Sequence, residues 1–155
     1  MEIFKADIKD NEILTSITKK SKAYWGFSKD ILKEWEQLLT VTKDYIEKNE
    51  VYKLVHHNQT IGYYSYFPTD GNAIKLDNMF ILPEFIGNGF GKILMNDFLK
   101  NARQLGIHKI TLDAEPNVEK FYKIFGFETI GYLESSIKDR YLPIMELQIE
   151  KKNNS

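Results

Sequence analysis

The chain has 155 residues, a length typical of one domain that buries its core without help from metals or disulfides. Its 21 basic and 22 acidic residues nearly cancel, so no chain-wide positive field favours nucleic acid or an anionic membrane as a partner. It has no cysteine and no apolar run near the roughly 18 residues of a membrane span, so we expect a soluble, cytoplasmic protein without disulfides, thiolate metal sites or a cysteine nucleophile.

Helical patterns dominate the first third of the chain, after one short strand at residues 2–8. Asp10, Ser28 and Thr42 are each placed to cap the start of a helix. The apolar positions of the three expected helices are Ile13, Leu14 and Ile17, then Ile31, Leu32, Trp35, Leu38 and Leu39, then Tyr45 and Ile46.

The rest of the chain mixes strands with two further helices, which we expect to end at Gly106 and Gly126. An aromatic cluster at 63–67 predicts a core of large rings. No linker or repeat divides the chain, so we predict a single domain over residues 1–150 and a polar tail at 151–155. The expected strands, of which the first three form an antiparallel meander, are 51–57, 60–67, 73–82, 109–114, 128–133 and 142–149.

The most informative segment is a glycine run at the end of the meander. A strand pattern leads into three alternating glycines, Gly87, Gly89 and Gly91, and an amphipathic helix follows. Glycine lets the backbone approach a ligand closely, and the first helical turn offers amides without internal partners at the positive end of the helix dipole. The run therefore predicts an anion site, with a phosphate as the expected ligand.

Two common nucleotide motifs do not fit this run. A Walker loop requires a glycine and a hydroxyl where the chain has Ile86 and Ile93. In a dinucleotide fingerprint the third glycine would fall on Lys92 or Leu94. Both motifs also belong to βαβ units, whereas this run follows a meander, so neither a nucleoside triphosphate nor NAD is favoured.

The run instead resembles the acetyl-CoA-binding motif of the GNAT superfamily of N-acetyltransferases. That pattern is Arg or Gln, two residues, Gly, one residue, then Gly or Ala; the chain has Gly89-Phe90-Gly91, with Ile86 at the polar position. A second match lies downstream, where Pro116-Asn117 is followed by Phe121-Tyr122 and then Gly126-Phe127 in the family's order. The resemblance extends over nearly the whole chain.

This resemblance implies the GNAT fold, an α+β (three-layer α/β) arrangement. Its central sheet is mixed and mostly antiparallel, with about seven strands, about four helices and splayed strands at the acetyl-CoA site. It also implies acetyl-CoA as cosubstrate and no metal, and the three scattered histidines do not suggest a metal site. The implied cofactor contacts are Gly87, Asn88, Gly89, Phe90, Gly91 and Lys92 for the pyrophosphate, Met79, Phe80 and Ile81 for the pantetheine arm, and Asn117 and Tyr122.

Acetyl transfer from a thioester to an amine needs a proton acceptor and a proton donor. An amine of pKa about 10.4 is almost wholly protonated at pH 7, and the departing thiolate is helped by a proton. The resemblance implies Tyr122 as the donor and Asp77 as a base that acts through water. The alternatives are structural: Tyr122 packs within its helix, Asp77 faces solvent from its strand, and Asn117 is placed to cap the helix that carries Tyr122.

In this fold the acceptor side lies at the N-terminal third and the last hairpin. Tyr24 and Trp25, next to Gly26, are candidates for the wall of a small pocket, and Asn78 is a further candidate contact. Arg140 is a candidate partner for a carboxylate of the acceptor. Alternatively, Trp25 is a hydrophobic plug at a helix end, and Arg140 holds the hairpin loop.

Three function classes remain open from the sequence. The leading one is an acetyl-CoA-dependent N-acetyltransferase, an acyltransferase acting on the primary amine of a small molecule by direct attack in a ternary complex, with Tyr122 as general acid. The others are a protein or peptide N-acetyltransferase, which needs an open groove, and a non-catalytic acyl-CoA sensor. Strands at the C-terminal edge are compatible with a homodimer.

Overall fold

The computed structural model describes residues 2–135, 137 and 139–149, so the predicted polar tail lies outside the described residues. These residues form two compact units. The first combines the chain up to Tyr66 with Asn78–Leu99, and the second combines Phe67–Asp77 with the chain from Lys100 onward.

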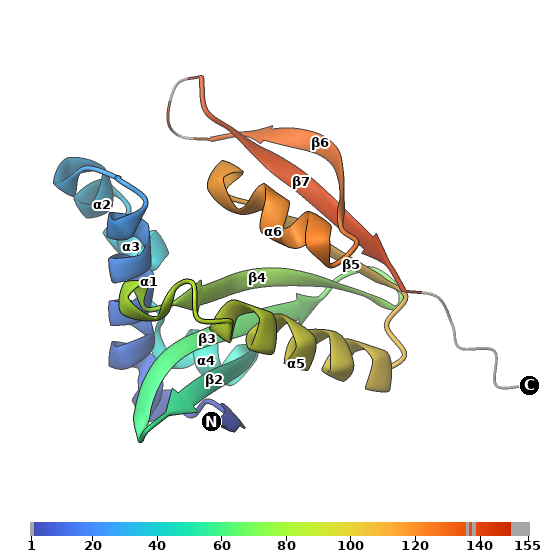
Figure 1. Ribbon diagram of the computed structural model, residues 1–155, viewed down its shortest axis with the longest axis horizontal. Helices are drawn as coiled ribbons and strands as arrows, with labels where there is room; N and C mark the ends of the chain where they lie inside the picture. Colours follow the sequence, from blue (N-terminus) through green and yellow to red (C-terminus); the bar gives the residue numbers. More distant parts are fainter. Residues whose placement is uncertain (1, 136, 138, 150–155) are drawn as a thin grey trace, which may run out of the picture. The chain divides into compact units, whose positions relative to one another are not determined.

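The elements follow the predicted order, although the N-terminal helices are more numerous than expected. In chain order they are β1 (Glu2–Lys5), η1 (Ile8–Asp10), α1 (Asn11–Tyr24), α2 (Lys29–Glu34), α3 (Glu36–Leu39), α4 (Lys43–Lys48), β2 (Glu50–His56), β3 (Gln59–Pro68), β4 (Ala73–Ile81), η2 (Pro83–Phe85), α5 (Phe90–Gln104), β5 (Lys109–Asp113), η3 (Pro116–Val118), α6 (Glu119–Ile124), β6 (Glu128–Glu134) and β7 (Tyr141–Gln148), where η marks a short 3₁₀ helix (Figure 1).

The described strands form a seven-stranded sheet, as predicted. Their hydrogen-bonded order is β1-β2-β3-β4-β5-β7-β6. β4 and β5 pair in parallel, whereas β1–β2, β2–β3, β5–β7 and β6–β7 are antiparallel. The sheet is therefore mixed and mostly antiparallel. Among the described helices, none is long and apolar enough to cross a membrane.

Two of the three predicted helix caps are confirmed. The Ser28 hydroxyl accepts a hydrogen bond from the Ile31 amide at 3.2 Å, and the Thr42 hydroxyl accepts one from the Tyr45 amide at 3.0 Å. These bonds satisfy amides that the first helical turn leaves without partners.

The third cap and the expected second helix differ from the prediction. Asp10 precedes α1 but makes no side-chain cap; its carboxylate instead accepts from the Asp7 amide at 2.9 Å and from Lys53 Nζ at 3.0 Å. The second helix is broken at Trp35 into α2 and α3, and Leu38, expected on its apolar face, is 83% exposed.

β3 is the centre of the first unit, because residues 61–66 are buried. On one face the Tyr63 and Thr18 hydroxyls are hydrogen-bonded at 2.5 Å, which ties β3 to α1. On the other face Tyr64 donates to Asp97 of α5 at 2.6 Å. Helices thus cover both faces of β3, which explains its continuous apolar and aromatic sequence. The predicted core of large rings is confirmed.

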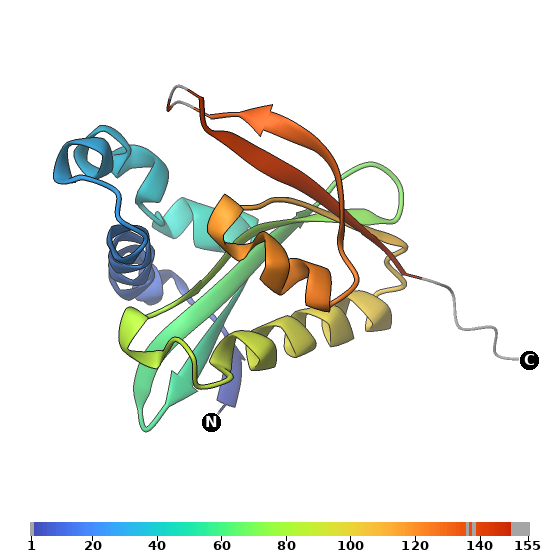
Figure 2. The ribbon, with the colours of Figure 1, turned by 45° about the horizontal axis from the view of Figure 1, so that its top comes forward.

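In the second unit, α6 lies beside the β6–β7 hairpin, as Figures 1 and 2 both show. The ladder of β4 with β5 in this unit is short: it joins Ala73–Lys75 to Lys109–Thr111. Both strands continue beyond it, and Lys75 Nζ donates to Asp113 Oδ2 at 2.8 Å where the ladder ends. This early end of the ladder agrees with the splayed strands that the resemblance implies.

Gly62 marks a close approach between β3 and β4. A Cβ placed on Gly62 would lie 2.8 Å from the Phe80 carbonyl oxygen and 2.7 Å from Ile81 Cδ1. The carbonyl cannot retreat easily, since the Leu82 amide donates to the Ile61 carbonyl at 2.7 Å and holds the two segments together. Only glycine fits this position without displacing backbone.

We predict that Gly62→Ala lowers the free energy of unfolding by about 1–3 kcal/mol, because the added methyl group overpacks the contact with β4. Gly131→Ala is the matched control: it also lies in a strand, but its Cβ would be 3.8 Å from Ile144 Cδ1, an ordinary contact. Urea unfolding of both variants measures the difference. Equal losses would contradict the steric explanation.

Candidate functional site

The glycine run forms a loop between η2 and α5 in the first unit. Gly87 and Gly89 have φ values of +88° and +84°, which side chains with a Cβ rarely adopt. A Cβ at either position would meet no protein atom within 4 Å. Glycine is therefore required by the backbone conformation, and the space above both residues stays open.

The first turn of α5 follows this loop and presents backbone donors. The Ile93 amide donates to the Gly89 carbonyl at 3.2 Å, which is the first bond of the α5 ladder. The amides of Phe90, Gly91 and Lys92 precede that bond and have no partner inside the helix. Three amides at the positive end of a 15-residue helix fit the pyrophosphate that the resemblance implies.

Neighbouring residues of β4 point to opposite faces of the sheet. Asn78 Nδ2 donates to Ser65 Oγ at 3.0 Å and to Tyr45 Oη at 3.2 Å, so its side chain is engaged on the face that α4 covers. Asp77, the expected base, is exposed and precedes Asn78 on the strand. The two side chains therefore leave the strand on opposite faces of the sheet.

The pantetheine segment Met79–Ile81 belongs to the last part of β4 in the first unit. Phe80 lies on the Asn78 face, where its ring is 5.9 Å from that of Tyr63. Ile81 lies on the opposite face, beneath Gly62. Its carbonyl accepts a hydrogen bond from Ser21 of α1 at 2.9 Å.

Tyr122 lies on α6 in the second unit. It is 8% exposed, and its ring makes edge contacts with Phe121 at 5.4 Å and Phe127 at 5.8 Å. Burial raises the pKa of Tyr122 above its ordinary value, so the phenol stays protonated at neutral pH.

Asn117 does not cap the helix that carries Tyr122. α6 begins after Val118, which makes no side-chain cap, and Asn117 lies exposed in the preceding 3₁₀ turn η3. The expected cap was wrong because the Pro116–Val118 turn places Asn117 one residue too early. Its predicted contact with the cofactor remains a prediction.

Arg140 is engaged by an acidic residue of its own unit. Its guanidinium forms an ion pair with the Glu115 carboxylate, and the two side chains are 19% and 18% exposed. The Arg140 backbone also closes the hairpin loop, accepting from the Ser135 amide at 3.1 Å. Of the two roles open from the sequence, these contacts favour holding the loop. Glu115 was missed, although it directly precedes the Pro116-Asn117 pair of the second family motif.

Tyr24 and Trp25 lie where α1 ends, before Gly26 with its φ of +89°. Their rings meet edge to face at 5.0 Å and remain 52% and 36% exposed. Nearby, Lys22 Nζ lies 5.6 Å from the ring centre of Phe80 and 5.9 Å from that of Phe27. These cation–π contacts link the α1–α2 turn to β4.

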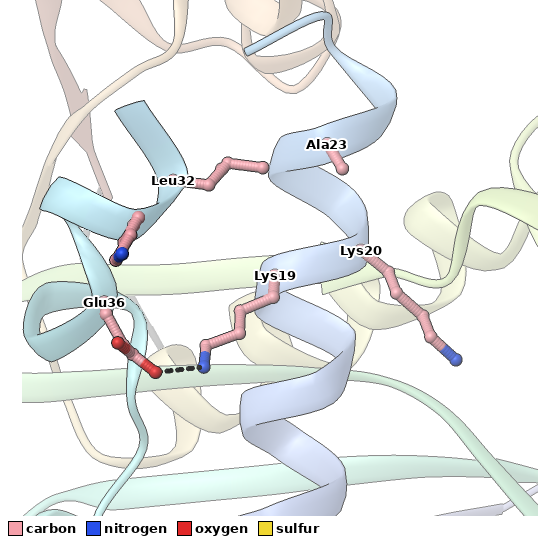
Figure 3. A pocket seen from close by; sticks show the side chains of 6 residues that line it. Lys19, Lys20, Ala23, Leu32 and Glu36 are labelled. Atoms are coloured by element: carbon pink, nitrogen blue, oxygen red, sulfur yellow. Dashed lines mark hydrogen bonds and ion pairs between the residues drawn. The ribbon is translucent and has the colours of Figure 1, made fainter. Parts of the chain in front are cut away.

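A surface hollow of about 410 Å³ lies on the N-terminal helices. In Figure 3, Lys19 reaches across it to Glu36 at 3.5 Å, and Leu32 points toward α1. In the sequence, the lysine-rich run at 19–22 is the feature that points to this hollow. The orientation of α1 about its axis decides which of these lysines line the hollow. The lining residues are Lys19, Lys20, Ala23, Leu32, Lys33 and Glu36.

The predicted site residues divide between the two units. The glycine loop, Asn78, Met79–Ile81 and Tyr24–Trp25 belong to the first, whereas Asp77, Asn117, Tyr122 and Arg140 belong to the second. Within the described residues, no group of three or more His, Asp or Glu side chains is placed to hold a metal ion.

Comparison with known proteins supports the resemblance. A family model described as an acetyltransferase (GNAT) domain matches residues 6–150. The [ribosomal protein bS18]-alanine N-acetyltransferase of Haemophilus influenzae is 33% identical over 92 residues, which cover 59% of this chain and 60% of that protein. The uncharacterized N-acetyltransferase ycf52 of Porphyra purpurea is 34% identical over 82 residues, which cover 53% of this chain and 44% of that protein. The chain thus spans about half the length of these curated relatives.

The fold has a counterpart among solved structures. The PaiA N-acetyltransferase from Thermoplasma acidophilum, in complex with coenzyme A, matches with a TM-score of 0.79 and 20% identity, over 96% of this chain and 98% of that chain. This likeness confirms the predicted GNAT architecture. Because the family model covers nearly the whole sequence, the chain belongs to the GNAT family of acetyltransferases.

Proposed function

We propose that this protein transfers the acetyl group of acetyl-CoA to the primary amine of a small molecule. The observation that carries this proposal is the glycine loop, in which two residues of positive φ lead into three amides without helical partners. Membership of the GNAT family supports the same chemistry. Acetyl-CoA supplies an acetyl group already activated as a thioester.

Binding of the CoA pyrophosphate would depend on backbone amides rather than on a side chain from the loop. The amides of residues 90–92 are suited to the pyrophosphate, and Gly87 and Gly89 leave space above the loop. Ile86, at the polar position of the family motif, is an aliphatic side chain that is 38% exposed and offers no hydrogen bond. The backbone of Met79–Ile81 is our candidate for the pantetheine arm, which would pair with it like an added strand.

Tyr122 is our candidate general acid. As the amine nitrogen bonds to the acetyl carbon, the carbon–sulfur bond breaks, and the Tyr122 hydroxyl gives its proton to the sulfur. Proton transfer from a phenol of pKa about 10 to a thiolate of pKa about 8.5 costs about 2 kcal/mol. The raised pKa of Tyr122 adds to this cost but keeps the donor protonated throughout the neutral range.

Asp77 is our candidate base, acting through water on the proton that the amine loses. Its exposure permits a water to reach the carboxylate. Asn78 is the weaker candidate for contact with the acceptor, because its amide nitrogen already donates to Ser65 and Tyr45. Tyr24 and Trp25 offer exposed rings for the acceptor side.

A peptide amine is the second candidate acceptor. The similarity to the bS18-alanine N-acetyltransferase of Haemophilus influenzae favours it, since that protein is named for an alanine of a ribosomal protein. A free peptide N-terminus and a small primary amine present the same nucleophile, so both acceptors fit the proposed chemistry.

We predict that Tyr122→Phe lowers kcat by about 100-fold or more, the usual loss on removing a general acid. The variant keeps the ring contacts with Phe121 and Phe127, so the Kd for CoA should change by less than about two-fold. Because burial raises the pKa of Tyr122, wild-type kcat should not fall between pH 7 and 9 through loss of this proton. Steady-state rates give kcat and its pH dependence, and calorimetric titrations give the Kd for CoA. An unchanged kcat would remove Tyr122 from the mechanism.

We predict that Gly89→Val weakens CoA binding by at least about 10-fold, because a β-branched residue at a φ of +84° costs about 1–2 kcal/mol and reshapes the loop. Gly106→Val is the matched control: it follows the other end of α5, has a φ of +72° and lies in open space. Both variants carry similar strain, so only Gly89→Val should affect the Kd for CoA. Equal Kd values would mean that the loop is misassigned.

We predict that acetyl-CoA turnover requires an amine acceptor. The chain has no cysteine, so a thiol reagent reports CoA release without background from the protein. The panel comprises small aliphatic amines, amino acids, a peptide with an N-terminal alanine, and no acceptor. Turnover with small amines supports the proposal, and turnover with the peptide alone supports the second candidate. CoA binding without turnover would indicate a sensor and overturn both.

A further inference from the structure

Three aromatic rings join the two ends of the glycine loop in the first unit. Phe85 ends η2 and Phe90 begins α5, so loop residues 86–89 lie between them. The two rings meet edge to face with centroids 5.7 Å apart. The His56 ring, at the end of β2, lies 5.0 Å from Phe90 and 6.1 Å from Phe85. We call His56, Phe85 and Phe90 the ring clamp.

The ring clamp rests on the β2–β3 hairpin. His56 pairs with Gln59 across a tight turn in which His57 and Asn58 have φ values of +50° and +61°. The His57 ring stacks on His56 at 4.0 Å. Burial, with a smaller contribution from His57, lowers the pKa of His56, so its ring is neutral at pH 7 and packs as an aromatic group.

The loop between the clamped ends needs an external restraint. Residues 86–89 are exposed, whereas Phe90 is only 7% exposed. Glycine loses more conformational freedom on ordering than any other residue, and fixing one residue's backbone costs about 1–2 kcal/mol. The loop has two such glycines, and Ile86 offers no polar group to tie it down. Packing of Phe85 on Phe90 fixes the distance between the loop ends instead.

We propose that His56, Phe85 and Phe90 are positioning residues for the cofactor loop. By holding the loop ends together, the ring clamp orders the amides of residues 90–92 before the pyrophosphate arrives, and binding therefore costs less conformational entropy. This inference rests on the proposed function, because CoA is the ligand that the loop would position.

The test compares ligands with and without the pyrophosphate. His56→Ala and Phe85→Ala each remove one ring, whereas His56→Phe keeps a ring at the same place. Phe4→Ala, which removes a 44% exposed ring from β1, is the matched control. Calorimetry gives the Kd for CoA and for pantetheine, and hydrogen–deuterium exchange of the ligand-free protein reports how often the hydrogen bonds of the Ile86 and Ile93 amides open at the two ends of the loop.

We expect both alanine variants to bind CoA about 10-fold more weakly, because part of the binding free energy is then used to order the loop. Their Kd for pantetheine should stay within about two-fold of wild type, since pantetheine lacks the group that the loop holds. The Ile86 and Ile93 amides, whose hydrogen bonds to the Pro83 and Gly89 carbonyls lie at the two ends of the loop, should exchange faster, and His56→Phe should restore both the CoA affinity and the slower exchange. Phe4→Ala should change none of these quantities.

Several results would overturn the proposal. An unchanged Kd for CoA in both alanine variants would contradict the ring-clamp proposal but would not affect the proposed function. A parallel loss of CoA and pantetheine affinity would indicate a general structural effect instead of loop positioning. Failure of the wild-type protein to bind CoA would overturn the proposed function and the clamp together. If Phe85→Ala lowers the Tm, Phe85→Leu, which keeps most of the apolar volume, takes its place in the comparison.

Discussion

Burial of β3 on both faces is the constraint on which the first unit depends. Because residues 61–66 are enclosed, the tyrosine hydroxyls among them need partners inside the protein. Tyr63 is hydrogen-bonded to Thr18 of α1 on one face, and Tyr64 donates a hydrogen bond to Asp97 of α5 on the other. A buried hydroxyl left without a hydrogen-bond partner costs about 1–3 kcal/mol, so these bonds hold α1 and α5 against β3.

The position of the candidate cofactor loop depends on this packing of α5 against β3. The rings of Tyr64 and Tyr66 each lie 5.4 Å from Phe98 on α5, which anchors the helix whose first turn carries the free amides. The loop itself stays exposed, so a buried frame presents an accessible backbone. In the second unit Tyr122 is itself buried: aromatic contacts hold its ring, and burial keeps its hydroxyl protonated.

Several features were predictable because they depend on nearby residues in the chain. Ser28 and Thr42 cap their helices through amides three residues away, and the glycine loop needs only a local backbone conformation. Asp10 failed as a cap because its carboxylate accepts hydrogen bonds from the nearby Asp7 amide and from a distant residue, Lys53. Arg140 likewise meets Glu115, 25 positions earlier in the chain, and no local pattern indicates that pairing.

The sequence by itself determined the order of the elements, the positive-φ conformation of the glycine run and the family to which the chain belongs. Each of these depends on periodicity, on glycine at a required φ or on short-range spacing, all of which are local properties of the chain. Only the tertiary structure decided that Asp10 meets Lys53, that Arg140 meets Glu115, and that His56 meets Phe85 and Phe90. These relations follow from strand register and side-chain packing between segments far apart in the chain, which local patterns do not encode.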